Sequence, residues 1–391
     1  MNKNILHTKV QDFIAKNLNS NISKLLFKGS PFDSINIQDL VEQIESKRKS
    51  LSKLPTWFDL NNIYYPNKLN IEQTSSEVTA NYKANLISGY SIVDLSGGFG
   101  VDTYYFSKRF KGVTHCEINT NLSEIVAHNF QLLKADTITV VPKDGLKYLP
   151  TQQEKYDWVY IDPSRRNDIK GKVFLLKDCL PNVPENLDTL FGFTNNILIK
   201  VSPMLDITSA INELKFVKEI HIIAVQNEVK ELLFILEKAY KKTIKVKTIN
   251  ITKSTEQIFK SDFKKEVTTK FSLPQTYLYE PNSAILKAGF FNEVSNQLEL
   301  NKLHKNSHLY TSFDLILFPG RRFKIIKQLS YNLKELKKLI RVSKANITVR
   351  NFPETVAQIR KKTKLKDGGD IYLFFTTNFN NKHIVLICKK V

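Results

Sequence analysis

Apolar and polar residues alternate along the middle of the chain in short blocks that predict a parallel β-sheet. Helical stretches separate most of the apolar blocks, and such alternation is typical of a sheet covered by helices on both faces. The expected fold class is therefore α/β, with a doubly wound, seven-stranded Rossmann-like domain. Residues 227–240 are expected to form the helix between the last two strands. The seven predicted strands are residues 91–95, 113–118, 137–141, 157–162, 196–202, 219–225 and 244–251.

Different patterns flank the predicted sheet. Residues 1–75 contain stretches with helical periodicity and are expected to form a helical N-terminal region. The sheet domain is expected over residues 76–270. Beyond it the pattern becomes irregular and predicts two small α+β domains, at residues 271–320 and 321–391. The last of these contains a strand, a helix and two more strands.

Charge adds an expectation about partners. The chain has 58 Lys plus Arg against 38 Asp plus Glu, a net charge of +20, which favours a polyanion such as nucleic acid. A lysine-rich surface of the kind that AT-rich genomes encode is the alternative. The last 51 residues have a net charge of +8. Part of this charge gathers on and just after one predicted helix, and we expect it to bind the RNA backbone, a solvated basic helix being the alternative. These residues are Lys361, Lys362, Lys364 and Lys366.

Other features narrow the class of protein. The three cysteines are far apart and the seven histidines lack the spacing of metal ligands, so no metal site is expected. No stretch approaches the roughly 18 apolar residues of a membrane span, and the first ten residues lack the apolar core of a secretory signal. We therefore expect a cytoplasmic protein with no membrane partner. The oligomeric state has no signal in the sequence.

The stretch VDLSGGFGVD, residues 93–102, predicts the ligand. In an open parallel sheet, the turn after the first strand is where the backbone comes closest to a bound ligand. Here Asp94 ends the strand, Gly98 and Gly100 belong to the turn, and Asp102 lies in the first turn of the helix. Two carboxylates repel a phosphate and attract the ammonium and sulfonium of S-adenosylmethionine. The glycines also miss the GxGxxG spacing, so a nicotinamide cofactor is the weaker interpretation.

Two more acidic residues follow the next strands. Glu117 ends the second strand, where a carboxylate binds the hydroxyls of an adenosine ribose. Asp144 follows the third strand and is expected to accept a hydrogen bond from the adenine amino group. Each residue taken singly has an alternative role as a helix cap or a solvated carboxylate. Their order on successive strands favours a cofactor site.

The fourth strand predicts the chemistry. It ends at Asp162 and Pro163, and the proline keeps the chain extended, so the carboxylate has a fixed direction. A carboxylate in this place can accept a proton from a nucleophile that is held in line with the methyl group. A proline turn that closes an ordinary strand is the alternative.

Taken in order, these motifs resemble the class I S-adenosylmethionine-dependent methyltransferases (EC 2.1.1.-). The segments EQTSSEVTANYKA, DPSRR, KVSPMLDI, YLYEPNSAILKAG and KLKDGGDIYLFFTT are similar to a more specific bacterial group. That resemblance implies a ferredoxin-like domain at residues 271–320 and a THUMP-like domain at residues 321–391. It implies RNA as the substrate by analogy alone.

The chain departs from the common pattern in two places. Ser96 stands where the loop usually has its first glycine. Ser164 and Arg165 stand where enzymes that methylate exocyclic amines usually have residues that stack on a flipped base. An exocyclic amine as the acceptor is thereby placed in doubt. A guanidinium can stack on a base or bind a phosphate, so Arg165 and Arg166 are expected to bind substrate, ion pairs within the fold being the alternative.

Three further residues are candidates. Gln73 and Ser76 are expected to close over the cofactor, beside a helix whose predicted cap is Thr74 or Ser75. Ser202 follows the fifth strand and is expected to border the acceptor pocket.

The favoured function is methyl transfer from S-adenosylmethionine to a base nitrogen of tRNA or rRNA, with Asp162, Pro163 and Arg165 as catalytic residues. Two alternatives stay open. One is an RNA-binding protein with an inactive cofactor domain, and the other is a methyltransferase that acts on a small molecule or a protein.

Overall fold

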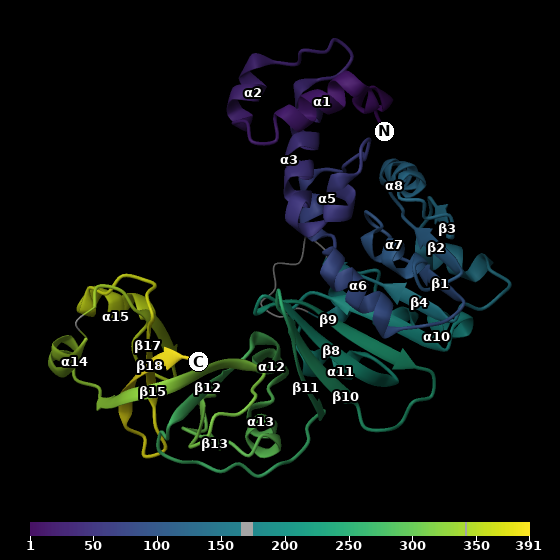
Figure 1. Cartoon of the computed structure of the whole chain (residues 1–391). Coiled ribbons are helices and arrows are strands. Elements are labelled where there is room, and N and C mark those ends of the chain that lie inside the picture. The colour runs from purple at the N-terminus through teal and green to yellow at the C-terminus, as the bar shows by residue number, and fades with distance from the viewer. Residues whose placement is uncertain (166–174, 341) are drawn as a thin grey trace. The chain divides into compact units, whose positions relative to one another are not determined.

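The structure is a computed structural model that describes residues 1–165, 175–340 and 342–391. The chain forms two compact units. The first comprises Met1–Lys218 and Phe234–Lys241, and the second comprises Glu219–Leu233 and Lys242–Val391 (Figure 1). Each unit is described in turn.

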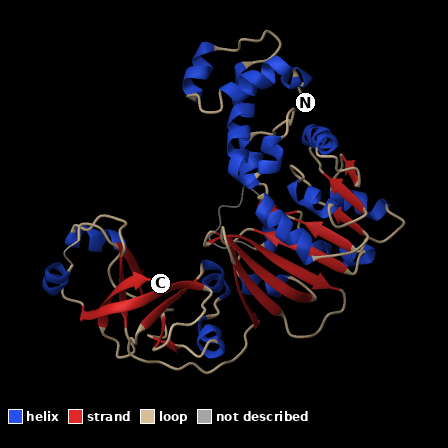
Figure 2. Cartoon of the chain, viewed as in Figure 1, coloured by secondary structure: helices blue, strands red, loops and turns tan. Residues whose placement is uncertain are grey.

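The first unit begins with a helical region, as the periodicity predicts (Figure 2). Asparagine side chains cap the starts of several helices, so polar residues mark the boundaries of the apolar periods. The helices enclose a small core that includes Ile14, Leu40 and Ile44. The elements are η1 (Lys3–Leu6), α1 (Thr8–Lys16), α2 (Ile22–Lys28), α3 (Ile37–Lys53), α4 (Pro55–Asp59) and α5 (Lys68–Gln73).

The same unit contains five parallel strands in the spatial order β3, β2, β1, β4, β7. The order reverses between β1 and β4, and ligands of such sheets bind where this reversal occurs, beyond the carboxyl ends of the strands. The strands are β1 (Ser91–Asp94), β2 (Gly112–Cys116), β3 (Ile138–Val141), β4 (Trp158–Ile161) and β7 (Asn196–Val201). The connecting helices are α6 (Glu77–Leu86), α7 (Val101–Ser107), α8 (Thr120–Leu132), α9 (Gly145–Tyr148), η2 (Leu149–Thr151), η3 (Leu176–Asp178), α10 (Val183–Phe193) and α11 (Ile207–Glu213).

The prediction of a helix at residues 227–240 is wrong, because the segment forms strand β9 (Glu228–Glu237). Its five consecutive apolar residues, 232–236, are all buried, as in a strand that is covered on both faces. Such a run has no period that separates helix from strand. Gln226 and Asn227 have φ of 51° and 65°, the left-handed pair that a two-residue hairpin turn requires, and they join β9 to β8 (Val217–Val225).

The other two strands of this part of the second unit are β10 (Lys245–Ile251) and β11 (Glu256–Asp262). Strand β10 pairs parallel to β8 and antiparallel to β11. All seven predicted strands are present. Strands β9 and β11 of this sheet were not predicted from the sequence.

A second sheet occupies the remainder of the second unit, in the order β13, β14, β12, β15, β18, β17, β16. Its strands are β12 (Tyr277–Pro281), β13 (Asn301–Lys302), β14 (Tyr310–Ser312), β15 (Gly320–Ser330), β16 (Asn346–Arg350), β17 (Ile371–Thr377) and β18 (His383–Lys390). The helices are α12 (Ser283–Ala288), α13 (Phe291–Gln297), α14 (Leu333–Leu339) and α15 (Val356–Thr363).

This sheet has a core on each face. Successive residues of β17 alternate between them, with Phe374 in one core and Phe375 in the other. The first core also contains Leu278 of β12, and β12 pairs with β15. The segments 271–320 and 321–391, expected as two small domains, therefore share one sheet and both contribute to the first of its two cores.

Candidate functional site

Three acidic residues lie at the same edge of the sheet in the first unit. Asp94 is the last residue of β1 and pairs in register with His115 of β2 and Tyr160 of β4, both near their strand ends. Glu117 directly follows β2, and Asp162 directly follows β4. Because the strands are parallel, their carboxyl ends face the same side, which gathers these residues around the turn after β1.

The glycine turn packs tightly on a buried histidine. A Cβ atom added to Gly97 would lie 2.3 Å from Nε2 of His115, so only glycine fits there. Gly100 has φ of 78°, which a side chain also disfavours. The imidazole of His115 is completely buried, and burial lowers its pKa to about 4, so the ring is neutral beneath the turn. Histidine here supports the backbone.

Asp94 fixes the turn through hydrogen bonds of its side chain. Its carboxylate accepts hydrogen bonds from the Ser96 backbone N–H at 2.9 Å and from the Thr103 hydroxyl at 2.7 Å. The side chain is buried, and this burial raises the pKa of Asp94 to about 7. Its hydrogen bonds thus give Asp94 a positioning role at the expected cofactor site.

Asp102 is occupied by protein groups. Its carboxylate accepts hydrogen bonds from the Tyr160 hydroxyl at 2.7 Å and the Ser75 hydroxyl at 2.8 Å, and it lies 3.1 Å from the ammonium of Lys83. Burial alone would raise the pKa of Asp102, but the charges of Lys83 and Lys200 hold it below its usual value. Groups of the protein itself therefore occupy the Asp102 carboxylate, which was expected to attract a cofactor. We do not include Asp102 among the proposed cofactor-binding residues.

Glu117 connects the second strand to the glycine turn. One carboxylate oxygen accepts the Gly98 N–H at 2.9 Å and the other accepts the Asn119 N–H at 2.7 Å. Each oxygen keeps a second lone pair, so the half-buried carboxylate can still accept from a ribose hydroxyl. The next side chain, Ile118, is 70% exposed and leaves an apolar surface open to solvent beside Glu117. The sequence reading overlooked this residue.

Asp144 caps a short helix. Its side chain accepts the Leu146 N–H at 2.9 Å at the start of α9, which is the alternative role expected for a single carboxylate. The side chain is half-buried, so its second oxygen has room for another donor.

The end of β4 is fixed by two contacts. The backbone N–H of Asp162 donates to the Ser96 hydroxyl at 2.6 Å, across the point where the strand order reverses. The Asp162 carboxylate forms an ion pair with Lys200 of β7. Side-chain exposure is 32% for Asp162 and 13% for Lys200, so the Asp162 side chain is reachable from solvent and the Lys200 side chain is mostly buried. Lys200 was missed by the sequence reading, although a lysine inside the apolar stretch NILIKVS is the signal that could have found it.

The segment after Asp162 is described only in part. Pro163 is buried, and Ser164 and Arg165 form the short strand β5 (Ser164–Arg165), which pairs with β6 (Cys179–Leu180). The Arg165 backbone lies opposite Cys179. Arg166 lies outside the described residues, so the expectation that it binds substrate is untested.

Ser202 follows β7 and accepts the Met204 N–H at 3.3 Å, which turns the chain there. Met204 is 78% exposed beside it. Gln73 ends α5 and is exposed. Ser76 is the N-cap of α6, where it accepts the Thr79 N–H at 3.2 Å. The predicted caps Thr74 and Ser75 are therefore wrong: Thr74 is the C-cap residue that follows α5, and the Ser75 hydroxyl donates to Asp102.

The basic cluster lies on α15 and the residues after it, in the second unit. Lys361, Lys364 and Lys366 are exposed. Lys362 differs, because its ammonium lies 2.8 Å from the carboxylate of Glu354. Three of the four lysines are thus the stronger candidates for phosphate contacts.

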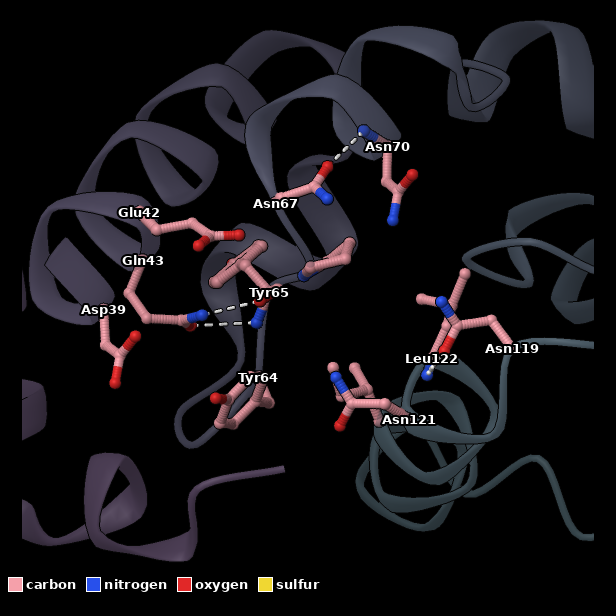
Figure 3. Close-up of a pocket in the computed structure, with 12 residues that line it drawn as sticks. Asp39, Glu42, Gln43, Tyr64, Tyr65, Asn67, Asn70, Asn119, Asn121 and Leu122 are labelled. Atoms are coloured by element: carbon pink, nitrogen blue, oxygen red, sulfur yellow. Dashed lines mark hydrogen bonds between the residues drawn. The ribbon is translucent and has the colours of Figure 1, made fainter.

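A polar pocket of about 210 Å³ opens in the first unit beside the start of α8 (Figure 3). Gln43 bridges to the backbone of Tyr65 through two hydrogen bonds of 2.6 and 2.9 Å, which fixes the pocket wall. Burial and then the charge of Asp39 raise the pKa of Glu42, another lining residue. The wall also contains Asn119 and Asn121, close after Glu117 in the chain.

Two general features complete the description. Across residues 1–165, 175–340 and 342–391, no helix is long and apolar enough to cross a membrane. In the same ranges, no three His, Cys, Asp or Glu side chains gather as a metal site.

Comparison with known proteins identifies similar chains. A crystal structure of a Porphyromonas gingivalis W83 protein, provisionally described as a methyltransferase, superposes with a TM-score of 0.89. The two chains are 32% identical, and the match covers 100% of this chain and 98% of the other. The THUMP domain-like family matches residues 320–390, and a ferredoxin-like domain family matches residues 277–319.

A curated relative is similar over a shorter stretch. An uncharacterized RNA methyltransferase of Mycoplasma mobile is 28% identical over 135 residues, which are 33% of this chain. The matched stretch spans 37% of that relative's length.

Proposed function

Because this chain belongs to the class I methyltransferase family of the Porphyromonas gingivalis protein and has a THUMP-like domain at residues 320–390, we propose that it methylates RNA with S-adenosylmethionine as the donor. One observation carries the proposal. Asp162, the reachable carboxylate at the end of β4, is held by Ser96 of the glycine turn and by Lys200 of β7. This joins the expected cofactor turn to an acceptor site.

The residues at the edge of the sheet suit the cofactor. Gly97 and Gly100 let the turn pack closely on the side chains of His115 and Phe130, whereas a Cβ atom at Gly98 would meet only the Ser96 carbonyl oxygen, at 3.7 Å, which leaves that side of the turn open. We propose that the Glu117 carboxylate binds the ribose hydroxyls and that Ile118 packs on the adenine. Asp144 is the further candidate for the adenine amino group. Bound S-adenosylmethionine supplies an electrophilic methyl group whose sulfonium becomes a neutral thioether when the methyl is transferred.

The acceptor is proposed to be a ring nitrogen of a tRNA or rRNA base. Asp162 first accepts the proton of the ring N–H, which leaves negative charge on the base, and the ring nitrogen then bonds to the methyl carbon as the carbon–sulfur bond of the donor breaks. The Lys200 ammonium lies beside the same carboxylate and stabilises negative charge that develops on the acceptor. An exocyclic amine instead becomes positive during transfer, so a neighbouring ammonium opposes it. The pairing of Asp162 with Lys200 therefore favours a ring nitrogen.

Methyl transfer can be tested with the purified chain, methyl-labelled S-adenosylmethionine and bulk bacterial RNA. The proposal expects label in material that ribonuclease releases, and loss of that label with Asp162→Ala. Label that resists ribonuclease but is released by protease, or that appears only in small molecules, would support a different acceptor class. An RNA-binding protein with an inactive cofactor domain would bind RNA and transfer nothing.

A further inference from the structure

One buried carboxylate in the C-terminal sheet holds two arginines. Glu280 of β12 is 3% exposed. Nε of Arg321 donates to one of its oxygens at 2.6 Å, and Nη2 of Arg350 donates to the other at 2.9 Å. Arg321 lies directly opposite Glu280 in the pairing of β12 with β15, whereas Arg350 comes from β16.

The cluster has an excess of positive charge. Two guanidinium groups share one carboxylate, which leaves a net charge of +1. The arginine side chains are 39% and 36% exposed, so solvent and ligands reach them. A single arginine would neutralise the charge of Glu280, so the second arginine is not needed to offset the desolvation cost of the buried carboxylate.

The guanidinium groups keep donors for a ligand. Each has five N–H groups in a fixed plane. Besides Glu280, Arg350 reaches the Val349 carbonyl oxygen through Nη1, at the long distance of 3.4 Å, while Nε is buried and not open to a ligand. Nη2 of Arg321 reaches only the Thr348 hydroxyl, at the long distance of 3.5 Å, besides Glu280. Glu280 therefore orients two planar donor groups and leaves part of their hydrogen-bonding capacity unused.

We propose that Arg321 and Arg350 bind a phosphate group of the RNA backbone, an inference that rests on the proposed RNA substrate. The guanidinium fork matches two oxygens of a phosphate, and an arginine whose direction is already fixed loses less entropy on binding. The ligand chemistry is a phosphodiester, and RNA is its source. The site involves none of the lysines that the sequence reading selected.

The position of the cluster fits an extended RNA contact. Strand β16 ends at Arg350. Two residues before the strand begins, the backbone of Lys344 forms an isolated parallel β-bridge with the backbone of Lys366. Arg350 lies six positions beyond Lys344, which corresponds to about 20 Å of extended chain. One RNA strand can therefore reach both the lysines that follow α15 and the arginine pair within the second unit.

The experiment measures binding of unfractionated bacterial tRNA to the full chain at several salt concentrations. Arg350→Gln and Arg321→Gln each leave Glu280 with one arginine, so the buried carboxylate keeps a partner. We expect each variant to bind about tenfold more weakly at low salt, and the slope of log K against log salt to fall by about 0.7 to 0.9. Lys245→Gln is the matched control, because it removes one charge from a lysine of the same unit that pairs with its own carboxylate, Asp262.

The results separate this inference from the proposed function. If wild-type protein binds tRNA and folded Arg350→Gln binds equally well with the same salt slope, the arginine pair is purely structural and the inference is overturned. Should Arg350→Gln fail to fold, Arg350→Lys decides, because it keeps the charge and loses the fork; we expect about a threefold loss, and unchanged affinity overturns the inference. Failure of the wild-type chain to bind any RNA would overturn the proposed function itself. Uridine 5′-phosphate is titrated in parallel as a competitor of tRNA. Tight competition by this nucleotide that is lost in Arg350→Gln would show that the site binds a free nucleotide, and it would contradict RNA as the source of the phosphate.

Discussion

The backbone N–H of Asp162 donates a hydrogen bond to the Ser96 hydroxyl at 2.6 Å, and this bond joins the turn after β1 to the end of β4. Ser96 stands where related loops usually have glycine. Its hydroxyl also lies 3.3 Å from the Asp94 carboxylate. The serine thus ties the expected cofactor turn to the expected acceptor carboxylate.

Ser96→Ala should damage transfer more than cofactor binding. The variant leaves the Asp162 N–H without its partner and releases the direction of the carboxylate, so turnover should fall about tenfold. The dissociation constant of S-adenosylmethionine, measured by calorimetry, should change less than threefold. Ser96→Thr keeps the hydroxyl and serves as the control. A larger loss of cofactor affinity than of turnover would place Ser96 in the cofactor pocket instead.

Lys200→Met should lower turnover about 100-fold, because the charge beside Asp162 disappears. Cofactor affinity should remain near that of the wild type. Lys200→Arg retains the positive charge and should recover part of the activity. Equal activity of all three proteins in single-turnover assays would show that the ion pair only supports the fold.

Glu117→Ala should weaken S-adenosylmethionine binding by about 1 to 3 kcal/mol, since the ribose hydroxyls lose a charged acceptor. The same change also removes the partner of the Gly98 N–H. Glu117→Gln keeps an oxygen for that N–H, so a comparison of the two variants by calorimetry separates the ribose contact from support of the turn. Unaltered affinity in both variants would remove Glu117 from the cofactor site.

Asp94 should make the stability of the fold depend on pH. Its pKa is raised to about 7 by burial, so the folded state retains a proton that the unfolded state has lost above about pH 4. The resulting stability is fully present below pH 4 and is lost as the pH rises through 7. Relative to Asp94→Asn, the wild-type free energy of unfolding should fall by about 1 kcal/mol per pH unit between pH 4 and 7. Urea titrations at several pH values measure this difference, and parallel pH curves for the two proteins would contradict it.

The sequence predicts the strands and the acidic edge well because both depend on local patterns. Short apolar blocks mark β1 to β4, and the residues that follow them end at one edge by topology alone. The hairpin of β8 and β9 escaped prediction because a run of apolar residues buried on both faces has no diagnostic period.

The pairings of charged residues also escaped prediction, for a different reason. Lys83 with Asp102 and Lys200 with Asp162 are separated by 19 and 38 residues in the chain, and each lysine sits in a segment that reads as an ordinary helix or strand. Sequence spacing gives no information on which strand ends meet until the strand order is known. Asp102 therefore looked available for a ligand, although Lys83 occupies it.

The most direct test of the account compares methylated nucleosides in total RNA from cells with and without the gene, by mass spectrometry. One methylated base nucleoside should be missing from the RNA of cells without the gene. The wild-type gene should restore this nucleoside, and a gene with Asp162→Ala should not. An identical set of methylated nucleosides in both RNA samples, or full restoration by the Asp162→Ala gene, would contradict the claim that this chain methylates RNA through Asp162.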